Sequence, residues 1–233
     1  MIADASLPPS DRPYAKLVGR QGLSDGHRMM IDAVRPGSRV LDVGCASGYL
    51  AEALAARGCT VVGIEPDATN AETARAFLSE LVVGDIERAD DRARLPGAFD
   101  YVLYGDVLEH LRDPWSVLRA THELHGRDGR VVVSIPNVAH WSARREIARG
   151  RFPYADSGLF DRTHLRFFTR ASAHELVASA GYEIEHEAFT RWRLPLQKWL
   201  GPLLPKSLQP KAARWWPELF AFQFVMTLRP RVP

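Results

Sequence analysis

The chain has 233 residues, which is long enough for one full α/β domain. Hydrophobic residues make up 46% of it and charged residues 25%, which excludes a disordered or fibrous protein. Thirty Lys and Arg residues against 28 Asp and Glu residues leave a formal net charge of +2, which argues against a nucleic-acid-binding protein. The chain begins without the pattern of a signal peptide, and it contains no run of about 18 apolar residues. We therefore expect a cytoplasmic protein without a transmembrane segment.

Short apolar runs rich in Val, Ile and Leu predict strands of a parallel sheet that is buried on both faces. The first five runs are residues 38–43, 60–65, 81–84, 99–104 and 130–135. Helix signals lie between them: Gly58 stands where one helix would end, and Asp67 and Asp113 are expected N-caps of two others. This alternation of strand and helix indicates a doubly wound α/β fold.

The pattern changes after residue 136. Residues 138–149 predict a helix, whereas residues 150–168 are rich in aromatic side chains and have no clear period. We interpret 150–168 as a loop that forms a lid over a site. Thr169 or Ser172 is then expected to open another helix, with Ser172 and Glu175 in the register of a capping box.

The last two predicted strands, residues 182–189 and 220–228, flank an insertion over residues 191–218. The insertion holds five prolines and four tryptophans. Tryptophans among lysines are typical of helices that lie at a membrane surface, so contact of 192–216 with a membrane is one hypothesis. The alternative is a cap that packs on the sheet and helps to close an acceptor pocket.

A nucleoside site is predicted at the ends of the first three strands. Gly44 and Gly48 follow the first strand, where glycine allows a tight turn and a close approach of ligand to main chain. A dinucleotide fold prefers glycine where Ala46 stands. Glu65 ends the second strand at the spacing at which an acidic side chain meets ribose hydroxyls. Asp85 ends the third strand, where a carboxylate accepts a hydrogen bond from an exocyclic amine.

Five motifs, VLDVGCASG, VGIEPD, VGDIE, FDYVLYGDVLEHL and GRVVVSIPN, resemble the ordered motifs of class I S-adenosylmethionine-dependent methyltransferases. The resemblance covers residues 38 to about 137. It implies a seven-stranded, mostly parallel sheet of order 3-2-1-4-5-7-6 with an antiparallel last strand, helices on both faces and a lid. It also implies S-adenosylmethionine as the cofactor and S-adenosylhomocysteine as the product. We expect a single methyltransferase domain over residues 1–233, with a cofactor-binding core at 24–137.

The same resemblance assigns roles around the cofactor. Gly44 and Gly48 would flank its methionine part, and Asp42 would support their loop. Glu65 would hold the ribose, and Asp85 with Ile86 would flank the adenine. The expected cofactor-binding residues are Asp42, Gly44, Cys45, Ala46, Gly48, Glu65, Pro66, Asp85, Ile86 and Asp106.

Residues that act on the methyl acceptor are expected after the fourth strand and in the lid. Methyl transfer aligns the acceptor with the sulfonium, and a hydroxyl acceptor must also lose a proton. Histidine accepts a proton near neutral pH, and arginine binds acidic groups. The predicted catalytic residues are His164, His110, Glu109 and Arg166, with His164 favoured as the base.

A metal site is a further hypothesis for the same region. Asp106, Glu109 and His110 resemble the E-x-x-E-H pattern of methyltransferases that use a divalent ion to bind vicinal hydroxyls, with Asp in place of the first Glu. Joined by His164, these groups are suited to a cation that lowers the pKa of a hydroxyl. Use of a divalent metal is left open.

The segment RFPYADSGLFDRTHLRFFTRASAHELVASAGYEI is similar to a branch of small-molecule methyltransferases that is distantly related to ubiquinone-pathway O-methyltransferases. We therefore expect a methyltransferase that acts on a hydroxyl or carboxyl of a small-molecule metabolite. The alternatives are N-methylation of an amino sugar or another small amine, and a non-catalytic module that binds S-adenosylmethionine. The glycine spacing disfavours a nicotinamide dehydrogenase. Assembly as a homodimer is left open.

Overall fold

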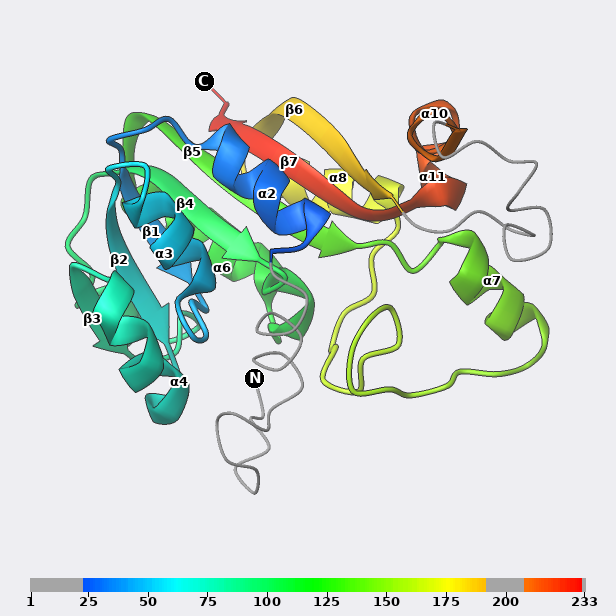
Figure 1. Ribbon diagram of the computed structural model, residues 1–233, viewed down its shortest axis with the longest axis horizontal. Helices are drawn as coiled ribbons and strands as arrows, with labels where there is room; N and C mark the ends of the chain where they lie inside the picture. Colours follow the sequence, from blue (N-terminus) through cyan, green and yellow to red (C-terminus); the bar gives the residue numbers. More distant parts are fainter. Residues whose placement is uncertain (1–22, 192–207, 232–233) are drawn as a thin grey trace.

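The computed structural model describes residues 23–191 and 208–231, which form a seven-stranded sheet with helices around it (Figure 1). The strands are β1 (Arg39–Val43), β2 (Thr60–Glu65), β3 (Glu80–Val83), β4 (Phe99–Gly105), β5 (His125–Pro136), β6 (Tyr182–Arg191) and β7 (Ala221–Pro230). Their order is β3-β2-β1-β4-β5-β7-β6. The first five strands pair in parallel, and β7 runs antiparallel to both of its neighbours. The predicted order and the antiparallel last strand are confirmed.

Helices cover both faces of the sheet, as predicted. The α-helices are α2 (Asp25–Ala33), α3 (Tyr49–Ala55), α4 (Ala68–Ala74), α5 (Ala89–Arg92), α6 (Pro114–Ala120), α7 (Trp141–Ala148), α8 (Arg170–Ser179), α10 (Leu208–Trp215) and α11 (Pro217–Phe220). Short 3₁₀ helices are η2 (Arg75–Phe77), η3 (Leu108–His110) and η4 (Thr121–Glu123). Helices α2 and α3 pack on one face, and α6 and α8 pack on the other (Figure 1).

Two hydrophobic clusters result from this arrangement, one on each face. Val40 of β1 belongs to the cluster that contains Leu50 and Leu54 of α3, whereas the next residue, Leu41, belongs to the cluster that contains Leu118 of α6. Successive side chains of a strand point to opposite faces, so each central strand must be apolar on both. Full burial of one such leucine stabilises the fold by roughly 1.5–3 kcal/mol. This explains why the strand segments of the sequence are rich in apolar residues.

Most elements agree with their predicted ranges, but several ends differ. Strand β5 begins at His125, ahead of the predicted start at residue 130. Helix α7 begins only at Trp141, because residues 137–140 form a turn and the His140 side chain caps the helix. Helix α4 ends at Ala74 and continues as η2. Helix α2, which packs over β4, β5 and β7, was not predicted.

Of the two expected starts of helix α8, Thr169 is confirmed, whereas the predicted capping box of Ser172 and Glu175 is wrong. Thr169 is the N-cap, and its hydroxyl accepts the amide of Ser172, while the Ser172 hydroxyl accepts the amide of Thr169. Ser172 therefore lies at the third helical position, where it supplies the reciprocal half of the box that the sequence pattern assigned to Glu175. The reason is that the chain enters the helix at Arg170, three residues earlier than a Ser172 cap requires.

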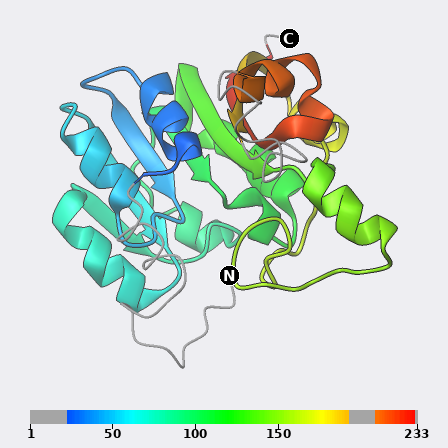
Figure 2. The ribbon, with the colours of Figure 1, turned by 45° about the vertical axis from the view of Figure 1, so that its right-hand side comes forward.

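Residues 150–168 contain no helix or strand and make only isolated bridges, at Ala155–Asp161 and Asn137–Phe168. Figures 1 and 2 both place this segment and α7 beside the end of β5, away from β2 and β3. Of the insertion at 191–218, the structure describes α10 and α11, and residues 192–207 with Trp192 and Trp199 lie outside the described residues. Within the described part of the chain, no helix is both long and apolar enough to cross a membrane.

Gly48 and Gly58 provide a test of the packing at the start of α3. Both residues have a left-handed backbone, with φ of 83° at Gly48 and 78° at Gly58. Their surroundings differ: a Cβ at Gly48 would lie 2.9 Å from the Ala74 Cα, whereas a Cβ at Gly58 would meet no atom within 4 Å. We expect Gly58→Ala to lower the free energy of unfolding by about 1 kcal/mol through backbone strain. Gly48→Ala should lower the free energy of unfolding by the same strain and by roughly 1–3 kcal/mol more, because the added Cβ overpacks against α4. Urea denaturation measures both, and equal losses would contradict the packing argument.

Candidate active site

The loop between β1 and α3 turns on three residues with a left-handed backbone, Gly44, Ala46 and Gly48. The amide of Gly44 donates to the Ile64 carbonyl at 2.8 Å, and the amide of Gly48 donates to the Cys45 carbonyl at 2.8 Å. Gly48 is needed for the packing of α3 against α4, since a Cβ there would contact Ala74. The sequence analysis explained this glycine by a tight turn and by the close approach of a ligand, and the structure adds its packing against α4 as a further cause.

Glu65 ends β2 and is fully buried, with 0% of its surface exposed. One carboxylate oxygen accepts the amide of Ala46 at 3.0 Å, and the other accepts the amide of Asp67 at 3.0 Å. Burial raises the pKa of Glu65, and these two backbone hydrogen bonds oppose the rise. The carboxylate thus holds the β1–α3 loop against the end of β2. A carboxylate has about four lone-pair sites, so these two amides do not use its full capacity to accept hydrogen bonds.

Asp42, in β1, lies behind the same loop and is 1% exposed. Its Oδ2 atom has no hydrogen-bond partner in the described structure. Burial, with a smaller contribution from the charge of Glu65, raises the pKa of Asp42 to about 7. The carboxyl group of Asp42 is therefore expected to change its protonation state near neutral pH.

The end of β3 supplies the third predicted position. The amide of Gly84 donates to the Glu65 carbonyl at 3.1 Å, which places the end of β3 beside the end of β2. The Asp85 side chain accepts the amide of Glu87 at 2.9 Å and so forms a tight local turn, and Ile86 is buried next to it. The structure thus places Glu65, Asp85 and Ile86 along one edge of the sheet, as the sequence predicted.

Asp106 follows β4 and has an unusual backbone, with φ of 54°. Its Oδ1 atom accepts hydrogen bonds from the Ser134 hydroxyl at 2.6 Å and from the Gln223 amide at 2.8 Å. A left-handed conformation in a residue other than glycine costs about 1–2 kcal/mol and persists only where neighbours enforce it. Ser134 of β5 and Gln223 of β7 therefore fix the Asp106 carboxylate at the carboxyl end of the sheet.

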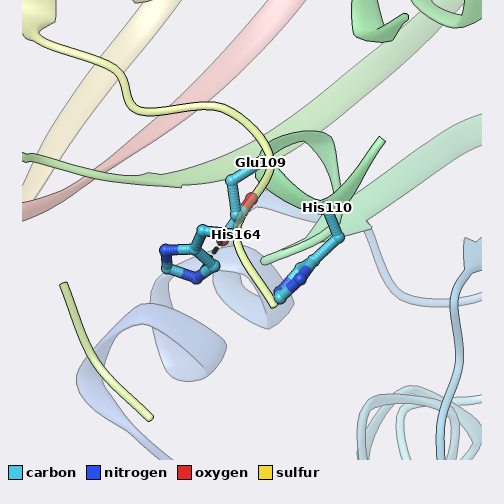
Figure 3. A group of neighbouring side chains, drawn as sticks. All are labelled: Glu109, His110 and His164. Atoms are coloured by element: carbon cyan, nitrogen blue, oxygen red, sulfur yellow. Dashed lines mark ion pairs between the residues drawn. The ribbon is translucent and has the colours of Figure 1, made fainter. Parts of the chain in front are cut away.

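Glu109, His110 and His164 form one compact cluster, which Figure 3 shows in close-up. One ligand atom from each residue lies within 4.8 Å of those of the other two. Glu109 Oε1 is 4.0 Å from His164 Nε2, and the two imidazole rings meet edge to face with centroids 4.8 Å apart. The segment 150–168 brings His164 to this place, because the amides of Leu165 and Arg166 both donate to the Glu109 carbonyl.

The electrostatics of this cluster are those of a buried acid beside two neutral imidazoles. Glu109 is 1% exposed, and neither of its carboxylate oxygens has a hydrogen-bond partner in the described structure. Burial and the charge of Asp106 raise the pKa of Glu109 well above its usual value. Burial lowers the pKa of His110 and, together with the neighbouring His110 ring, lowers the pKa of His164 to about 4. Both rings are uncharged at neutral pH.

Arg166 lies outside this cluster. Its guanidinium donates to the Arg112 carbonyl and lies over the Trp115 ring, with the guanidinium carbon 5.7 Å from the ring centroid. The sequence predicted that Arg166 holds an acidic acceptor, but in the structure its guanidinium already contacts Arg112 and Trp115 at the surface.

Two residues near the predicted site were missed by sequence reasoning. His27 of α2 and Tyr49 of α3 lie with ring centroids 4.7 Å apart. Burial and then the charge of Asp106 raise the pKa of Tyr49, and the same charge opposes the lowering of the His27 pKa by burial. A single histidine or tyrosine in a sequence gives no sign that its ring will lie near Asp106, and helix α2, which carries His27, was not predicted.

A separate hollow lies between α2 and strands β6 and β7. Its lining includes Arg35, Tyr101, Arg130 and Glu185, and Arg130 pairs in register with Tyr101 near the start of β4. Ligands of open α/β sheets bind at the carboxyl ends of the strands, so we do not assign the cofactor to this hollow.

Comparison with known proteins agrees with this geometry. Residues 15–187 match the family described as a methyltransferase domain, and the chain belongs to that family. Among curated proteins, it is 41% identical over 107 residues to the ubiquinone biosynthesis O-methyltransferase of Pseudomonas aeruginosa (strain LESB58), covering 43% of this chain and 45% of that protein. It is 40% identical over 119 residues to the enzyme of the same name from Neisseria meningitidis serogroup A, covering 48% of each. The chain thus spans just under half the length of these curated relatives.

Solved structures share the fold over nearly the whole chain. A TehB-like S-adenosylmethionine-dependent methyltransferase from Corynebacterium glutamicum has a TM-score of 0.59 at 18% identity, covering 94% of both chains. A magnesium protoporphyrin IX methyltransferase from Synechocystis PCC 6803, which contains bound S-adenosylhomocysteine, has a TM-score of 0.62 at 17% identity and covers 94% of this chain and 93% of that one. Fold and family together confirm a methyltransferase domain with a class I, Rossmann-like fold.

The raised pKa of Asp42 predicts a specific pH dependence of stability. The folded protein holds the Asp42 proton up to a pKa of about 7, whereas the unfolded chain releases it near 3.8. The free energy of unfolding should therefore fall as pH rises between these values, by a few kcal/mol in order of magnitude. In Asp42→Asn this component is absent, so the stability of the variant relative to the wild type should rise from about pH 5 to about pH 8. Urea denaturation of both proteins at the two pH values measures this difference. If the stabilities of the wild type and the variant change in parallel with pH, the raised pKa of Asp42 is refuted.

Proposed function

We propose that this protein transfers the methyl group of S-adenosylmethionine to a hydroxyl of a small-molecule metabolite, assisted by a divalent cation. The observation that carries the proposal is the cluster of Glu109, His110 and His164 beside Asp106 at the carboxyl end of β4. Open α/β sheets bind their ligands at this edge. The names of the curated relatives, ubiquinone biosynthesis O-methyltransferases, support a hydroxyl acceptor.

The cofactor is proposed to lie across the ends of β1, β2 and β3. Main-chain groups at Gly44 to Gly48 would contact its methionine part, Glu65 its ribose, and Asp85 with Ile86 its adenine. Cys45 and Ala46 are part of that loop, and Pro66 follows Glu65 on the surface. Residues 24–137 would thus form the cofactor-binding core and 150–168 the lid.

The cation site is proposed from the donors themselves. A buried carboxylate with two unpartnered oxygens is costly for a protein unless a positive charge joins it. Two imidazoles that stay neutral at pH 7 are in the correct state to bind a metal. Glu109, His110 and His164 would hold the ion, with Asp106 adding negative charge nearby. A bound divalent cation lowers the pKa of a hydroxyl at such a site.

The geometry changes the proposed role of His164. A histidine with a pKa of about 4 is a weak base, and it removes a hydroxyl proton poorly at neutral pH. We therefore infer that His164 binds the cation and orients the acceptor rather than serving as the base favoured by sequence reasoning. Arg166, which contacts Arg112 and Trp115, would act at the rim of the site.

Glu65 is tested by the affinity for S-adenosylhomocysteine. We expect Glu65→Gln to weaken binding by roughly tenfold or more, because a neutral amide is a poorer partner for ribose hydroxyls and for the loop amides. Glu80→Gln, the same change at an exposed position of β3, is the control and should bind as the wild type does. Isothermal titration calorimetry measures the affinities. Absence of heat with the wild-type protein would remove the proposed function altogether.

Glu109 is tested by metal binding without turnover. Mn²⁺ or Zn²⁺ should raise the melting temperature of the wild-type protein, since an ion that binds only the folded state stabilises it. Glu109→Gln should abolish this shift without lowering the stability of the metal-free protein, because the variant removes a buried unpaired acid. Glu123→Gln, at an exposed position of η4, should retain the full shift.

The same pair of variants tests the reaction. Products formed from methyl-labelled S-adenosylmethionine are identified by mass spectrometry. The wild type and Glu123→Gln should form O-methylated compounds. Glu109→Gln should form them at least about 100-fold more slowly, the effect of removing a group that stabilises a reacting oxygen. Products methylated only on nitrogen, or full activity in Glu109→Gln, would refute the proposal.

A further inference from the structure

His140, in the turn after β5, has a hydrogen-bonding pattern that the fold does not explain. The residue is 0% exposed. Its Nδ1 atom accepts the amide of Ser142 at 3.4 Å and lies 2.8 Å from the Ser142 hydroxyl, and so caps α7. A ring nitrogen that accepts a hydrogen bond carries no hydrogen, so the proton of the neutral ring is assigned to Nε2. Burial lowers the pKa of His140 to about 4, which keeps the ring neutral at physiological pH.

The Nε2–H group is thus a buried donor, and it has no acceptor among the residues that the structure describes. Most buried donors in native proteins are paired, and exceptions need an explanation. Two aromatic rings lie close to the imidazole: the Trp141 centroid is 5.6 Å away and the Phe222 centroid 5.5 Å away. A donor on a ring that packs beside aromatic side chains matches a hydroxyl oxygen carried by a planar ring.

The turn that carries His140 is held rigidly. The Asn137 side chain is fully buried and donates to the Glu218 carbonyl at 3.1 Å and to the Ala221 carbonyl at 2.8 Å. Its oxygen accepts the amide of Ala139 at 2.9 Å. The turn is therefore fixed to α11 and the start of β7, and His140 is preorganised without a ligand.

This turn lies next to the segment that supplies His164. The amide of Val138 donates to the Phe168 carbonyl at 2.9 Å, and the amide of Leu165 donates to the Glu109 carbonyl at 2.8 Å. The stretch from His164 to Phe168 therefore runs between η3 and the turn after β5. His140 and the Glu109 cluster follow neighbouring parallel strands, β5 and β4, at the edge where ligands of such sheets bind.

We propose that the Nε2–H group of His140 donates a hydrogen bond to a hydroxyl oxygen of the methyl acceptor and so positions that acceptor in the site. This inference rests on the proposed function and adds a binding residue to it. The hydrogen bond forms only when the acceptor is present, so the donor is left unpaired in the free protein. No contact of His140 with the cofactor is involved.

Two substitutions separate the nitrogens of the ring. Asn at position 140 places its oxygen near the Nδ1 position, so His140→Asn keeps the cap of α7 and removes the donor. Gln places its amide nitrogen near the Nε2 position, so His140→Gln keeps the donor and removes the cap. The probe is catechol, which offers hydroxyl oxygens on a planar ring, titrated into protein saturated with S-adenosylhomocysteine and Mn²⁺. We expect His140→Asn to bind catechol about tenfold more weakly and His140→Gln to stay close to the wild type.

The remaining readouts distinguish a binding role from a structural one. His140→Gln should lower the melting temperature and His140→Asn should not, which is the reverse of their order in catechol affinity. Both variants should bind S-adenosylhomocysteine as the wild type does.

If S-adenosylhomocysteine does not bind the wild-type protein, the proposed function fails. If it binds but catechol does not, or if His140→Asn binds catechol at full strength, only the role of His140 is overturned. A ¹⁵N spectrum that places the His140 proton on Nδ1 would also overturn it.

Discussion

A fully buried carboxylate that must be matched by hydrogen-bond donors controls the geometry of the cofactor side. Glu65 receives the amides of Ala46 and Asp67, and thereby joins the β1–α3 loop to the end of β2. Ala46 adopts a left-handed backbone that costs about 1–2 kcal/mol, and the charge-assisted hydrogen bond to its amide offsets that cost. The loop on which a nucleoside would rest is therefore set before any ligand arrives.

Acidic side chains are concentrated at the carboxyl ends of the central strands beyond what the fold requires. Asp42 and Glu109 are buried with unpartnered oxygens, and the charge of Asp106 acts on Tyr49, Glu109 and both clustered histidines. Burial of unpaired acids lowers the stability of a protein. Such an arrangement suits cationic ligands, and a sulfonium cofactor and a divalent ion are both cations. The proposed function thus gives one physical reason for several costly groups.

The acceptor side depends on contacts between segments far apart in the chain. Residues 164–168 bind through their main chain to Glu109 on one side and Val138 on the other, and Gln223 of β7 reaches Asp106 after β4. These contacts bring His164 and His140 to the same edge of the sheet as Glu109. Because they involve backbone groups and irregular turns, they leave no periodic pattern in the sequence.

The sequence by itself predicted the sheet, because runs rich in apolar residues such as 38–43 and 130–135 are typical of strands buried on both faces, and the ordered motifs implied the strand order that the structure confirms. It also placed Glu65, Asp85, Glu109 and His110 at strand ends. Tertiary structure decided that His164 meets Glu109, that Gly48 is required by α4 and that Thr169 rather than Ser172 caps α8. It also decided that Gln223 and Tyr49 lie near Asp106, and that the Nε2 atom of His140 is buried without a partner in the described structure. Local patterns encode which residues become strand or helix, whereas the burial and partner of a single polar atom depend on chain segments that only folding brings together.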